Sequence, residues 1–338
     1  MKIEENVSLK DYNTFGIEAS AEYFTEINSE KELVELLLSP VFKGNKKLIL
    51  GGGSNILFTG NFKGLVVKIN ISGIKTVSEN ADKIILEAGA GVVWNDLVNF
   101  AVDNNWGGLE NLSLIPGTAG AAPMQNIGAY GQELKNVFYN LEGYFIENGR
   151  KKSFRPDECQ FGYRESIFKY ELKDKFIITK IRLSLRKNPS PDIFYGTVKS
   201  ELEKLGIEHI TVNDVRNVVC KIRREKLPDP AVSGNAGSFF KNPVIDEEDF
   251  LVLKNKFPEI VSFPAEDNKI KLAAGWLIEQ CGWKGKRFGQ TGIHEKQALV
   301  LVNLGKASGK EILNVADNIK KSVRDKFGIV LTEEVNIY

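Results

Sequence analysis

The spacing of apolar residues predicts that this chain mixes helices and strands. Short continuous or alternating apolar runs predict strands, at 48–50, 56–58, 65–69, 83–86, 176–185, 298–302 and 329–338. Helical spacing predicts helices, at 33–37, 93–104, 215–224, 247–256, 272–280 and 308–327. Because strands dominate the first half and alternate with helices in the second, we expect an α+β fold.

Local signals mark the ends of several of these elements. Ser29 and Ser308 are followed three residues later by Glu32 and Glu311, which is the capping-box pattern of a helix start. Gly328 predicts the end of the last helix, because glycine readily adopts the left-handed conformation that ends helices.

Two further segments predict turns. Asn148-Gly149 between apolar runs is typical of a β-hairpin. Residues 187–192 contain two prolines among small polar residues, so they predict a linker or an exposed loop.

Composition narrows the class of protein. A chain of 338 residues can form two or three domains, since domains commonly contain about 100–200 residues. Its 45 basic and 44 acidic residues balance, so we expect no nucleic-acid partner and infer a small-molecule ligand. No stretch approaches the roughly 18 apolar residues of a membrane span, and the amino terminus lacks a signal-peptide pattern. We therefore expect a cytoplasmic protein without a membrane partner.

Few side chains could hold a metal or form disulfides. The cysteines are Cys159, Cys220 and Cys281, an odd number without a C-x-x-C pair. The only histidines, His209 and His294, lack zinc-site spacing. We expect neither a disulfide framework nor a catalytic metal.

The segment 115–131 is the most informative part of the chain. Gly117, Gly120, Gly128 and Gly131 lack a Cβ, and small residues separate them. This composition predicts backbone amides that no side chain covers over about seventeen positions, which is a setting for an anion such as a diphosphate.

A second small-residue loop contains Gly51, Gly52, Gly53, Ser54 and Asn55 between two predicted strands. Neither loop has the glycine spacing and helix of a Rossmann fingerprint or the terminal Gly-Lys-Ser/Thr of a Walker A motif. A lone glycine cluster is more often a structural turn, but two long ones make that interpretation weaker.

Three polar residues could carry chemistry. Ser238 lies in a low-bulk loop without a neighbouring base, so it could be a turn serine or a proton donor. Arg164 follows a glycine between aromatic residues and could bind a carboxylate or pair with a surface acid. In the last predicted strand, alternation places Glu333 on the more apolar face and Glu334 on the other.

These motifs, in this order, resemble the UDP-N-acetylenolpyruvoylglucosamine reductases, flavoenzymes of peptidoglycan precursor synthesis. The matching segments are Asn13-Thr-Phe-Gly16, 51–58, 115–131, 161–166, 234–243, 273–281 and 331–335. Seven ordered matches over nearly the whole chain are far more specific than either loop alone.

The resemblance implies FAD in a two-part domain of the p-cresol methylhydroxylase or vanillyl-alcohol oxidase type, with an α/β substrate domain. The implied FAD subdomains are 1–70 and 71–227, the second completed by strand 328–338, and the implied substrate domain is 228–327. The residues implied to hold FAD are Gly51, Gly52, Gly53, Ser54, Asn55, Gly117, Thr118, Ala119, Gly120, Ala122, Gln125, Asn126, Gly128 and Tyr130. NADPH would be the co-substrate.

The resemblance also implies roles in catalysis. Arg164 and Glu334 would stabilise the enolate formed when hydride reaches the enolpyruvyl group of UDP-N-acetylglucosamine enolpyruvate, and Ser238 would protonate it. The motif Leu-x-x-Glu-Val selects Glu334, although alternation favours Glu333. The residues implied to bind substrate are Tyr195, Arg223, Lys226, Asn242 and Gln297. Tyr195-Gly196 matches the family form with a tyrosine-bearing loop, and a monomer is expected.

Two other functions stay open at this point. An FAD oxidase of the same superfamily could act on an alcohol, although Ser238, Arg164 and Glu334 together disfavour it. A flavin or nucleotide-sugar binding protein without activity is the other alternative.

Overall fold

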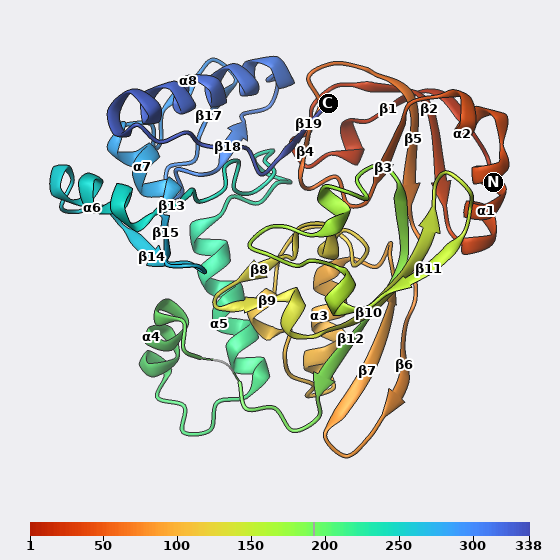
Figure 1. Cartoon of the computed structure of the whole chain (residues 1–338), viewed down its shortest axis with the longest axis horizontal. Coiled ribbons are helices and arrows are strands. Elements are labelled where there is room, and N and C mark those ends of the chain that lie inside the picture. Colours follow the sequence, from red (N-terminus) through yellow and green to blue (C-terminus); the bar gives the residue numbers. More distant parts are fainter. Residues whose placement is uncertain (192) are drawn as a thin grey trace. The chain divides into compact units, whose positions relative to one another are not determined.

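The computed structural model describes residues 1–191 and 193–338, and the chain divides into two compact units (Figure 1). Unit 1 comprises Met1–Val7, Ala21–Gly52 and Lys63–Glu225, and unit 2 comprises Ser8–Ser20, Gly53–Phe62 and Lys226–Tyr338. Asp192, which ends the predicted linker 187–192, lies outside the described residues.

Unit 1 contains a four-stranded sheet in the order β1-β2-β5-β3. Its strands are β1 (Glu4–Ser8), β2 (Ser20–Ile27), β3 (Lys47–Leu50) and β5 (Phe62–Ile69). Helices α1 (Glu30–Leu38) and α2 (Pro40–Gly44) connect β2 to β3, which pairs in parallel with β5. Leu33, Leu36 and Leu37 of α1 pack with β5, forming a βαβ-like opening.

A five-stranded antiparallel sheet in the order β11-β10-β12-β7-β6 forms the centre of unit 1. Its strands are β6 (Ile74–Glu79), β7 (Lys83–Gly89), β10 (Phe138–Phe145), β11 (Lys151–Phe154) and β12 (Phe176–Arg186). One face packs on α3 (Trp94–Asp103), burying Trp94 and Leu97. Tyr144 and Ile177, on the other face, join the core of the four-stranded sheet, so the two sheets share buried side chains.

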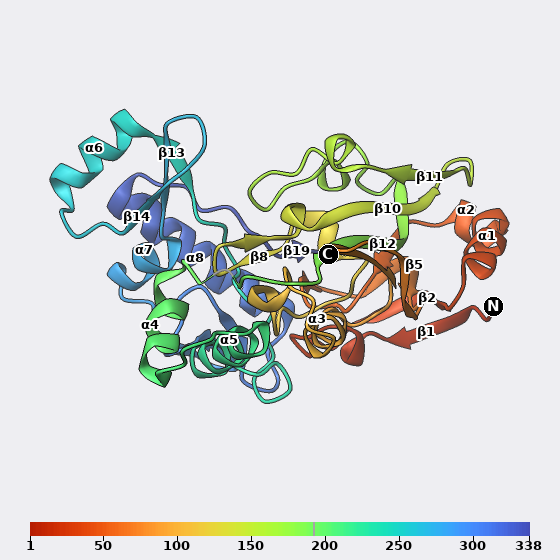
Figure 2. The same cartoon turned by 90° about the horizontal axis from the view of Figure 1, so that it is seen from below.

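Helices α4 (Gly196–Leu205) and α5 (Val212–Lys226) lie against each other (Figures 1 and 2). Val198 and Leu202 of α4 contact Val215 and Val219 of α5, and Tyr130 packs against this cluster. The pair therefore fixes the chain next to Tyr130.

Unit 2 contains three small sheets and the longest helix. Its strands are β4 (Ile56–Leu57), β13 (Val244–Asp246), β14 (Ser262–Pro264), β15 (Lys269–Leu272), β16 (Arg287–Phe288), β17 (Thr291–Ile293), β18 (Leu301–Asn303) and β19 (Asn336–Ile337). Its helices are α6 (Glu247–Lys256), α7 (Ala274–Gln280) and α8 (Gly309–Phe327). The sheets have the orders β13-β15-β14, β16-β17-β18 and β19-β4.

The predicted helix boundaries with strong caps are confirmed. Ser29 caps α1 by accepting a hydrogen bond from the Glu32 amide, and Ser308 forms the full capping box with Glu311. Gly328 ends α8 in the left-handed conformation. The predicted hairpin is also present, because β10 and β11 pair across Gly149.

The prediction of one strand over 329–338 is wrong. Only β19 is a strand there, and it pairs in parallel with β4. Leu331 and Val335 are buried while Ile337 is 38% exposed, so the expected alternation is broken. The physical reason is that the segment bonds first to Phe239 and Lys241 and then to Asn55, rather than to one neighbouring strand.

The three domains expected from the sequence stay a prediction, because they are defined by the ligand that each would hold rather than by compactness. Among the described residues, no helix combines the length and the apolar character needed to cross a membrane.

Candidate functional site

The two glycine loops of unit 1 touch each other. A Cβ at Gly52 would lie 2.9 Å from the Gly117 Cα, and a Cβ at Gly51 would lie 2.8 Å from the Thr118 Oγ1. A Cβ at Gly120 would lie 2.4 Å from the Ala90 Cβ. Glycine is therefore required here for close packing of the chain on itself as well as for access.

The prediction that the whole 115–131 segment leaves its amides uncovered is wrong for part of it. The amides of Ala119 and Gly120 donate to the carbonyls of Val92 and Ala90, and those of Ala121 and Ala122 donate to Thr118. The reason is that Ala119 and Gly120 pack against the chain that follows β7, while Ala121 and Ala122 form a turn on Thr118.

Three other amides fit an anionic ligand better. Within the described chain, the amides of Gly52, Gly117 and Thr118 donate no hydrogen bond. They lie where the two loops meet, and the glycines at 52 and 117 bring the two backbones close together there. Converging donors of this kind suit the oxygens of a diphosphate, so the loops fit the diphosphate of a dinucleotide such as FAD.

The other end of the Gly51–Asn55 loop is fixed within unit 2. Gly53 has a φ of +64°, and a Cβ there would lie 1.9 Å from the Tyr12 carbonyl oxygen, so only glycine fits. The Thr14 amide donates to the Gly53 carbonyl at 3.0 Å. The Asn13-Thr-Phe-Gly16 motif thus supports the loop.

Side-chain hydrogen bonds join residues 124–128 to residues 162–166 within unit 1. Asn126 Nδ2 donates to the Gly162 carbonyl at 3.0 Å, and Ser166 Oγ donates to the Met124 carbonyl at 2.7 Å. Asn126 is fully buried and also bonds to Glu133, so its side chain holds the loop together. Its contact with a cofactor stays a prediction.

Arg164 makes another of these bonds. Its Nη2 donates to the Gly128 carbonyl at 2.6 Å, and its guanidinium lies 5.5 Å from the centre of the Tyr163 ring. Its backbone is left-handed, with a φ of +59°, in a turn closed by pairing of Gly162 with Glu165. This conformation, rare for arginine, places the guanidinium against the 128–131 turn.

Tyr130, Tyr195 and Arg223 form a cluster beside Arg164. The Tyr130 and Tyr195 rings meet edge to face, with centroids 5.4 Å apart. Arg223 Nε is buried without a hydrogen-bond partner, and among the described residues no carboxylate pairs with this guanidinium. Burial lowers the pKa of Arg223, Tyr130 opposes this shift, and the Arg164 charge reinforces it. A buried guanidinium without a carboxylate partner predicts an anionic ligand at Arg223.

In unit 2, a short segment places Ser238 next to Glu334. Ser238 pairs with Val300, the Phe239 amide donates to Leu299, and the Glu334 amide donates to the Phe239 carbonyl, the two bonds each being 2.8 Å long. The segment therefore runs between two others, and it brings Ser238 close to Glu334 along the backbone.

Asn55 and Glu333 complete this part of unit 2. Asn55 Nδ2 donates to the Glu334 carbonyl at 3.2 Å. The Glu333 carboxylate, favoured by alternation, forms an ion pair with Lys320 of α8 at 2.6 Å. Glu333 thus has a structural partner on α8. The choice of Glu334 rests on the Leu-x-x-Glu-Val motif and stays a prediction.

Asn242 and Gln297 both lie at the start of α7. Asn242 Oδ1 accepts from the Ala274 amide at 3.0 Å, and a Cβ at Gly275 would lie 3.2 Å from Gln297 Oε1. Lys226 is exposed at the end of α5. The structure therefore brings two of the predicted substrate-binding residues of unit 2 together.

Sequence reasoning gave no role to Asn235, which supports Ser238. Asn235 is buried, and its Oδ1 accepts from the Gly237 amide at 2.9 Å, one residue before Ser238. Its carbonyl accepts from Thr14 Oγ1 at 2.6 Å. The available sequence signal is an asparagine between Gly234 and Gly237, because asparagine side chains readily bond to nearby backbone groups in turns.

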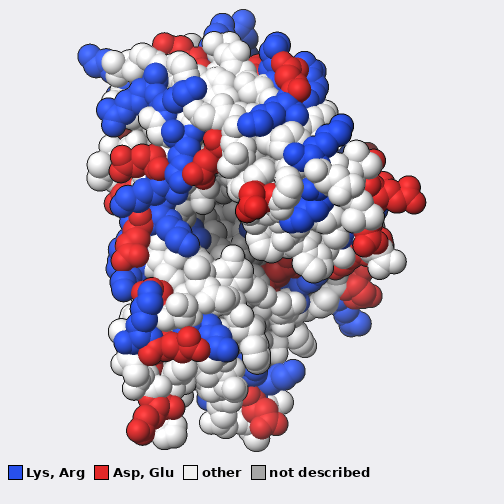
Figure 3. All heavy atoms as spheres, turned by 90° about the vertical axis from the view of Figure 1, so that its left-hand side faces the viewer, with Lys and Arg blue, Asp and Glu red and all other residues white. Residues whose placement is uncertain are grey.

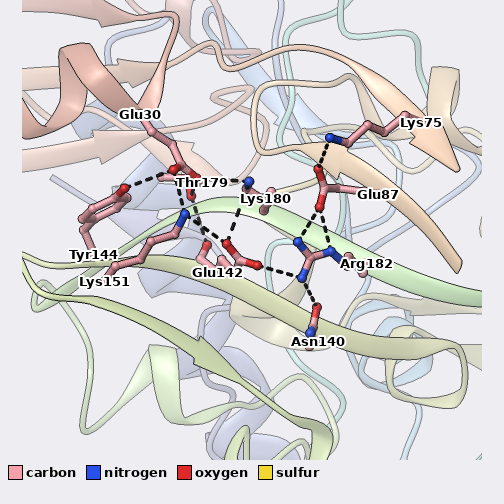
Figure 4. A network of polar contacts seen from close by, with 10 residues as sticks. All are labelled: Glu30, Lys75, Glu87, Asn140, Glu142, Tyr144, Lys151, Thr179, Lys180 and Arg182. Atoms are coloured by element: carbon pink, nitrogen blue, oxygen red, sulfur yellow. Dashed lines mark hydrogen bonds and ion pairs between the residues drawn. The ribbon is translucent and has the colours of Figure 1, made fainter. Parts of the chain in front are cut away.

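A second polar group in unit 1 has a different character (Figure 4). Arg182 contacts Glu87 through Nε and Nη2, each at 2.6 Å, and Glu142 through Nη1 at 2.7 Å. Glu30 accepts from Lys151 at 2.8 Å and from Thr179 at 2.9 Å. Burial alone would raise the pKa of Glu30, but these bonds and one from Tyr144 lower it to about 2. We call these residues the Glu30–Arg182 network.

Basic and acidic side chains are interspersed on the face drawn in Figure 3. No extended area of one charge is visible on that face, so the face drawn there shows no basic patch that would bind a polyanion such as a nucleic acid.

Two family models match the sequence. The model described as UDP-N-acetylenolpyruvoylglucosamine reductase, C-terminal domain, matches residues 229–338. The model described as FAD binding domain matches residues 21–146, which include the Gly51–Asn55 loop and the whole of 115–131.

Relatives extend the similarity to the full length. The UDP-N-acetylenolpyruvoylglucosamine reductase of Flavobacterium johnsoniae is 49% identical, with 100% of both chains covered. The reductase of the same name from Pseudomonas aeruginosa is 46% identical, covering 100% of this chain and 99% of its own.

A solved structure supports the fold. The UDP-N-acetylenolpyruvylglucosamine reductase of Thermus caldophilus has a TM-score of 0.68 at 24% identity, covering 100% of this chain and 99% of its own. Together with the FAD-binding domain, this match confirms the predicted α+β fold class.

Proposed function

Because this chain belongs to the UDP-N-acetylenolpyruvoylglucosamine reductase family, we propose that it reduces UDP-N-acetylglucosamine enolpyruvate to UDP-N-acetylmuramate for peptidoglycan synthesis. It is a flavin-dependent oxidoreductase by family and by its FAD-binding domain. The observation that carries the specific reaction is the placement of Ser238 beside Glu334 within the family's C-terminal domain.

The glycine loops would hold the FAD diphosphate through the Gly52, Gly117 and Thr118 amides. Gln125, Gly128 and Tyr130 would lie along the flavin ring. When bound, FAD would supply the transfer of a hydride from NADPH to the enolpyruvyl group.

Arg164, Glu334 and Ser238 would act on the substrate. Hydride addition to the enolpyruvyl double bond leaves negative charge next to the substrate carboxylate. The Arg164 guanidinium would stabilise this enolate, and Glu334 in its protonated form would donate a hydrogen bond to it. Ser238 Oγ–H would then deliver the proton to carbon, which a weak acid can do because the acceptor is strongly basic.

Other residues would bind the nucleotide part of the substrate. Lys226 and Asn242 have donors suited to phosphate oxygens, and Tyr195 and Gln297 can add hydrogen bonds. Arg223, whose Nε lacks a partner, would gain one from an anionic group of the ligand. We place the reaction in the cytoplasm and propose that the enzyme is a monomer.

Anaerobic flavin absorbance tests cofactor, donor and acceptor together. The purified protein would be reconstituted with FAD, reduced with NADPH and then given UDP-N-acetylglucosamine enolpyruvate. Bleaching followed by recovery is expected. Bleaching without recovery would overturn the substrate, and failure to bind FAD would overturn the proposal as a whole.

The Ser238→Ala variant tests the proton donor. We expect normal FAD binding and flavin reduction, and a flavin reoxidation step that is slower by about 10²–10⁴-fold, the usual range for general acids. The variant Ser233→Ala, in the same loop, is the control. Slow flavin reduction with normal reoxidation would remove Ser238 from the role.

A further inference from the structure

Lys68 is a cation at the Gly51–Asn55 loop that the reaction above does not use. It lies on β5, opposite Leu50 in the parallel pairing with β3. Its Nζ donates a hydrogen bond to the Gly51 carbonyl. Both residues belong to unit 1, so the contact lies within one compact body.

This bond fixes the direction of a whole peptide group. The peptide bonds of the described chain contain no cis form, and in a trans peptide the C=O and the next N–H point in opposite directions. With the Gly51 carbonyl held by Lys68, the Gly52 N–H must point away from Lys68. The Gly52 amide, like those of Gly117 and Thr118, donates no hydrogen bond within the described chain.

The charge of Lys68 also lacks a matching carboxylate. No ion pair involves Lys68 within the described residues, and Glu26, on neighbouring β2, acts on it only at longer range. Burial lowers the pKa of the Lys68 ammonium, a cost that a nearby anion would offset. Most lysines of this chain with such contacts point to acids, as Lys151 does to Glu30.

We propose that Lys68 strengthens the binding of the dinucleotide diphosphate, by aiming the Gly52 amide at it and by supplying positive charge at the loop. This inference rests on the proposed function, because it assumes that the loop holds FAD. Lys68 is a positioning residue and takes no part in hydride or proton transfer.

The proposal can be tested by titrating the apoprotein with FAD and monitoring binding through the quenching of flavin fluorescence. Lys68→Met removes both the hydrogen bond and the charge, and we expect FAD to bind about 10- to 100-fold more weakly. Lys68→Gln can still donate to the Gly51 carbonyl without the charge, so an intermediate affinity is expected. Lys63→Met, an exposed position on the same strand, is the matched control and should bind like the wild type.

Riboflavin has the flavin ring but no phosphate. Comparing its affinity with that of FAD therefore distinguishes an effect on diphosphate binding from an effect on ring binding. Its affinity should be equal in wild type and in both Lys68 variants. Wild-type FAD affinity in Lys68→Met, or equal losses for FAD and riboflavin, would overturn the role of Lys68 while leaving the function intact. If Lys68→Met does not fold, the FAD and riboflavin affinities of Lys68→Gln are compared with those of the wild type instead. If the wild-type apoprotein binds no FAD, the proposed function itself fails.

Discussion

Two groups of charged residues in unit 1 differ in how their charges are matched. In the Glu30–Arg182 network, Arg182 meets Glu87 and Glu142, and its side chain is 18% exposed. In the other group, Arg223 has a buried Nε without a partner and the like-charged Arg164 nearby. A network that satisfies itself stabilises the fold, whereas a cation left unsatisfied costs free energy unless a ligand arrives.

This contrast teaches how to separate structure from function among polar clusters. Both groups are partly buried and both contain perturbed pKa values, so perturbation alone does not distinguish them. The two groups are distinguished by whether the protein itself supplies an opposite charge. Removing a matched charge should change stability, and removing an unmatched one should change ligand binding.

Between these two groups of charges, the largest expected effect on turnover is that of Arg223→Met. We expect kcat/KM for the enolpyruvyl substrate to fall by about 10- to 100-fold, as for loss of one charge-assisted hydrogen bond. Stability to urea should stay equal or rise, because a buried unpaired cation is removed. Steady-state kinetics and urea unfolding, with the exposed Arg224→Met as control, measure both. Unchanged kinetics together with lost stability would reverse the interpretation of this group.

The Arg182→Met variant should show the opposite pattern. Removing Arg182 leaves Glu87 and Glu142 without their closest partner, so we expect the free energy of unfolding to drop by about 2–3 kcal/mol. FAD affinity should not change. The control is Arg324→Met, whose side chain is 61% exposed. A stable Arg182→Met protein with weak FAD binding would break the comparison.

A smaller effect is expected for Glu30→Gln, and it should depend on pH. The pKa of Glu30 falls from 4.5 to about 2 on folding, so its stabilisation is present above about pH 4.5 and is lost as the pH falls toward 2. At neutral pH we expect a loss on the order of 1–2 kcal/mol, discounted for solvent screening. The wild type and variant should converge in urea unfolding as the pH falls to about 2. A constant difference down to pH 2 would argue against this ionisation.

The smallest effect should come from Lys151→Met. Lys151 contacts Glu30 and Glu142 but is 41% exposed, so water can replace much of what is lost. We expect less than about 1 kcal/mol of destabilisation by urea unfolding. A loss as large as that of Arg182→Met would show that exposure does not rank these pairs.

Elements with local signals could be predicted from the sequence. The bounds of α8 follow from Ser308, Glu311 and Gly328, which act within one turn of the helix ends. The predicted bounds of α6 also agree with the structure, and its first turn carries acidic residues and its last turn basic ones. Such signals need no knowledge of the rest of the chain.

Elements that depend on partners far away in the sequence could not be predicted from the sequence. Helix α4 was not predicted, because only its packing of Val198 and Leu202 on α5 gives it a buried face. The tail after α8 reads as a strand, but its hydrogen bonds go to Phe239 and Asn55, which no local pattern reveals.

The candidate site divides in the same way. The glycine loops and the segment containing Ser238 could be located from their composition. Which amides are free could not be predicted, because the amides of Ala119 and Gly120 donate to the Val92 and Ala90 carbonyls through packing that the sequence does not reveal. The choice between Glu333 and Glu334 required the motif, since alternation does not reveal that Lys320 pairs with Glu333.

The pairing of β4 with β19 has a consequence for biosynthesis. Asn55 bonds to Glu334, and Thr59 to Tyr338, each across 279 positions of the chain. A nascent chain that has passed Phe62 must therefore keep the apolar Ile56 and Leu57 unpaired until residues 334–338 have been translated. Contacts of such long range slow folding and expose unfinished chains to aggregation. We expect ribosome-associated chaperones to contact this segment during most of synthesis.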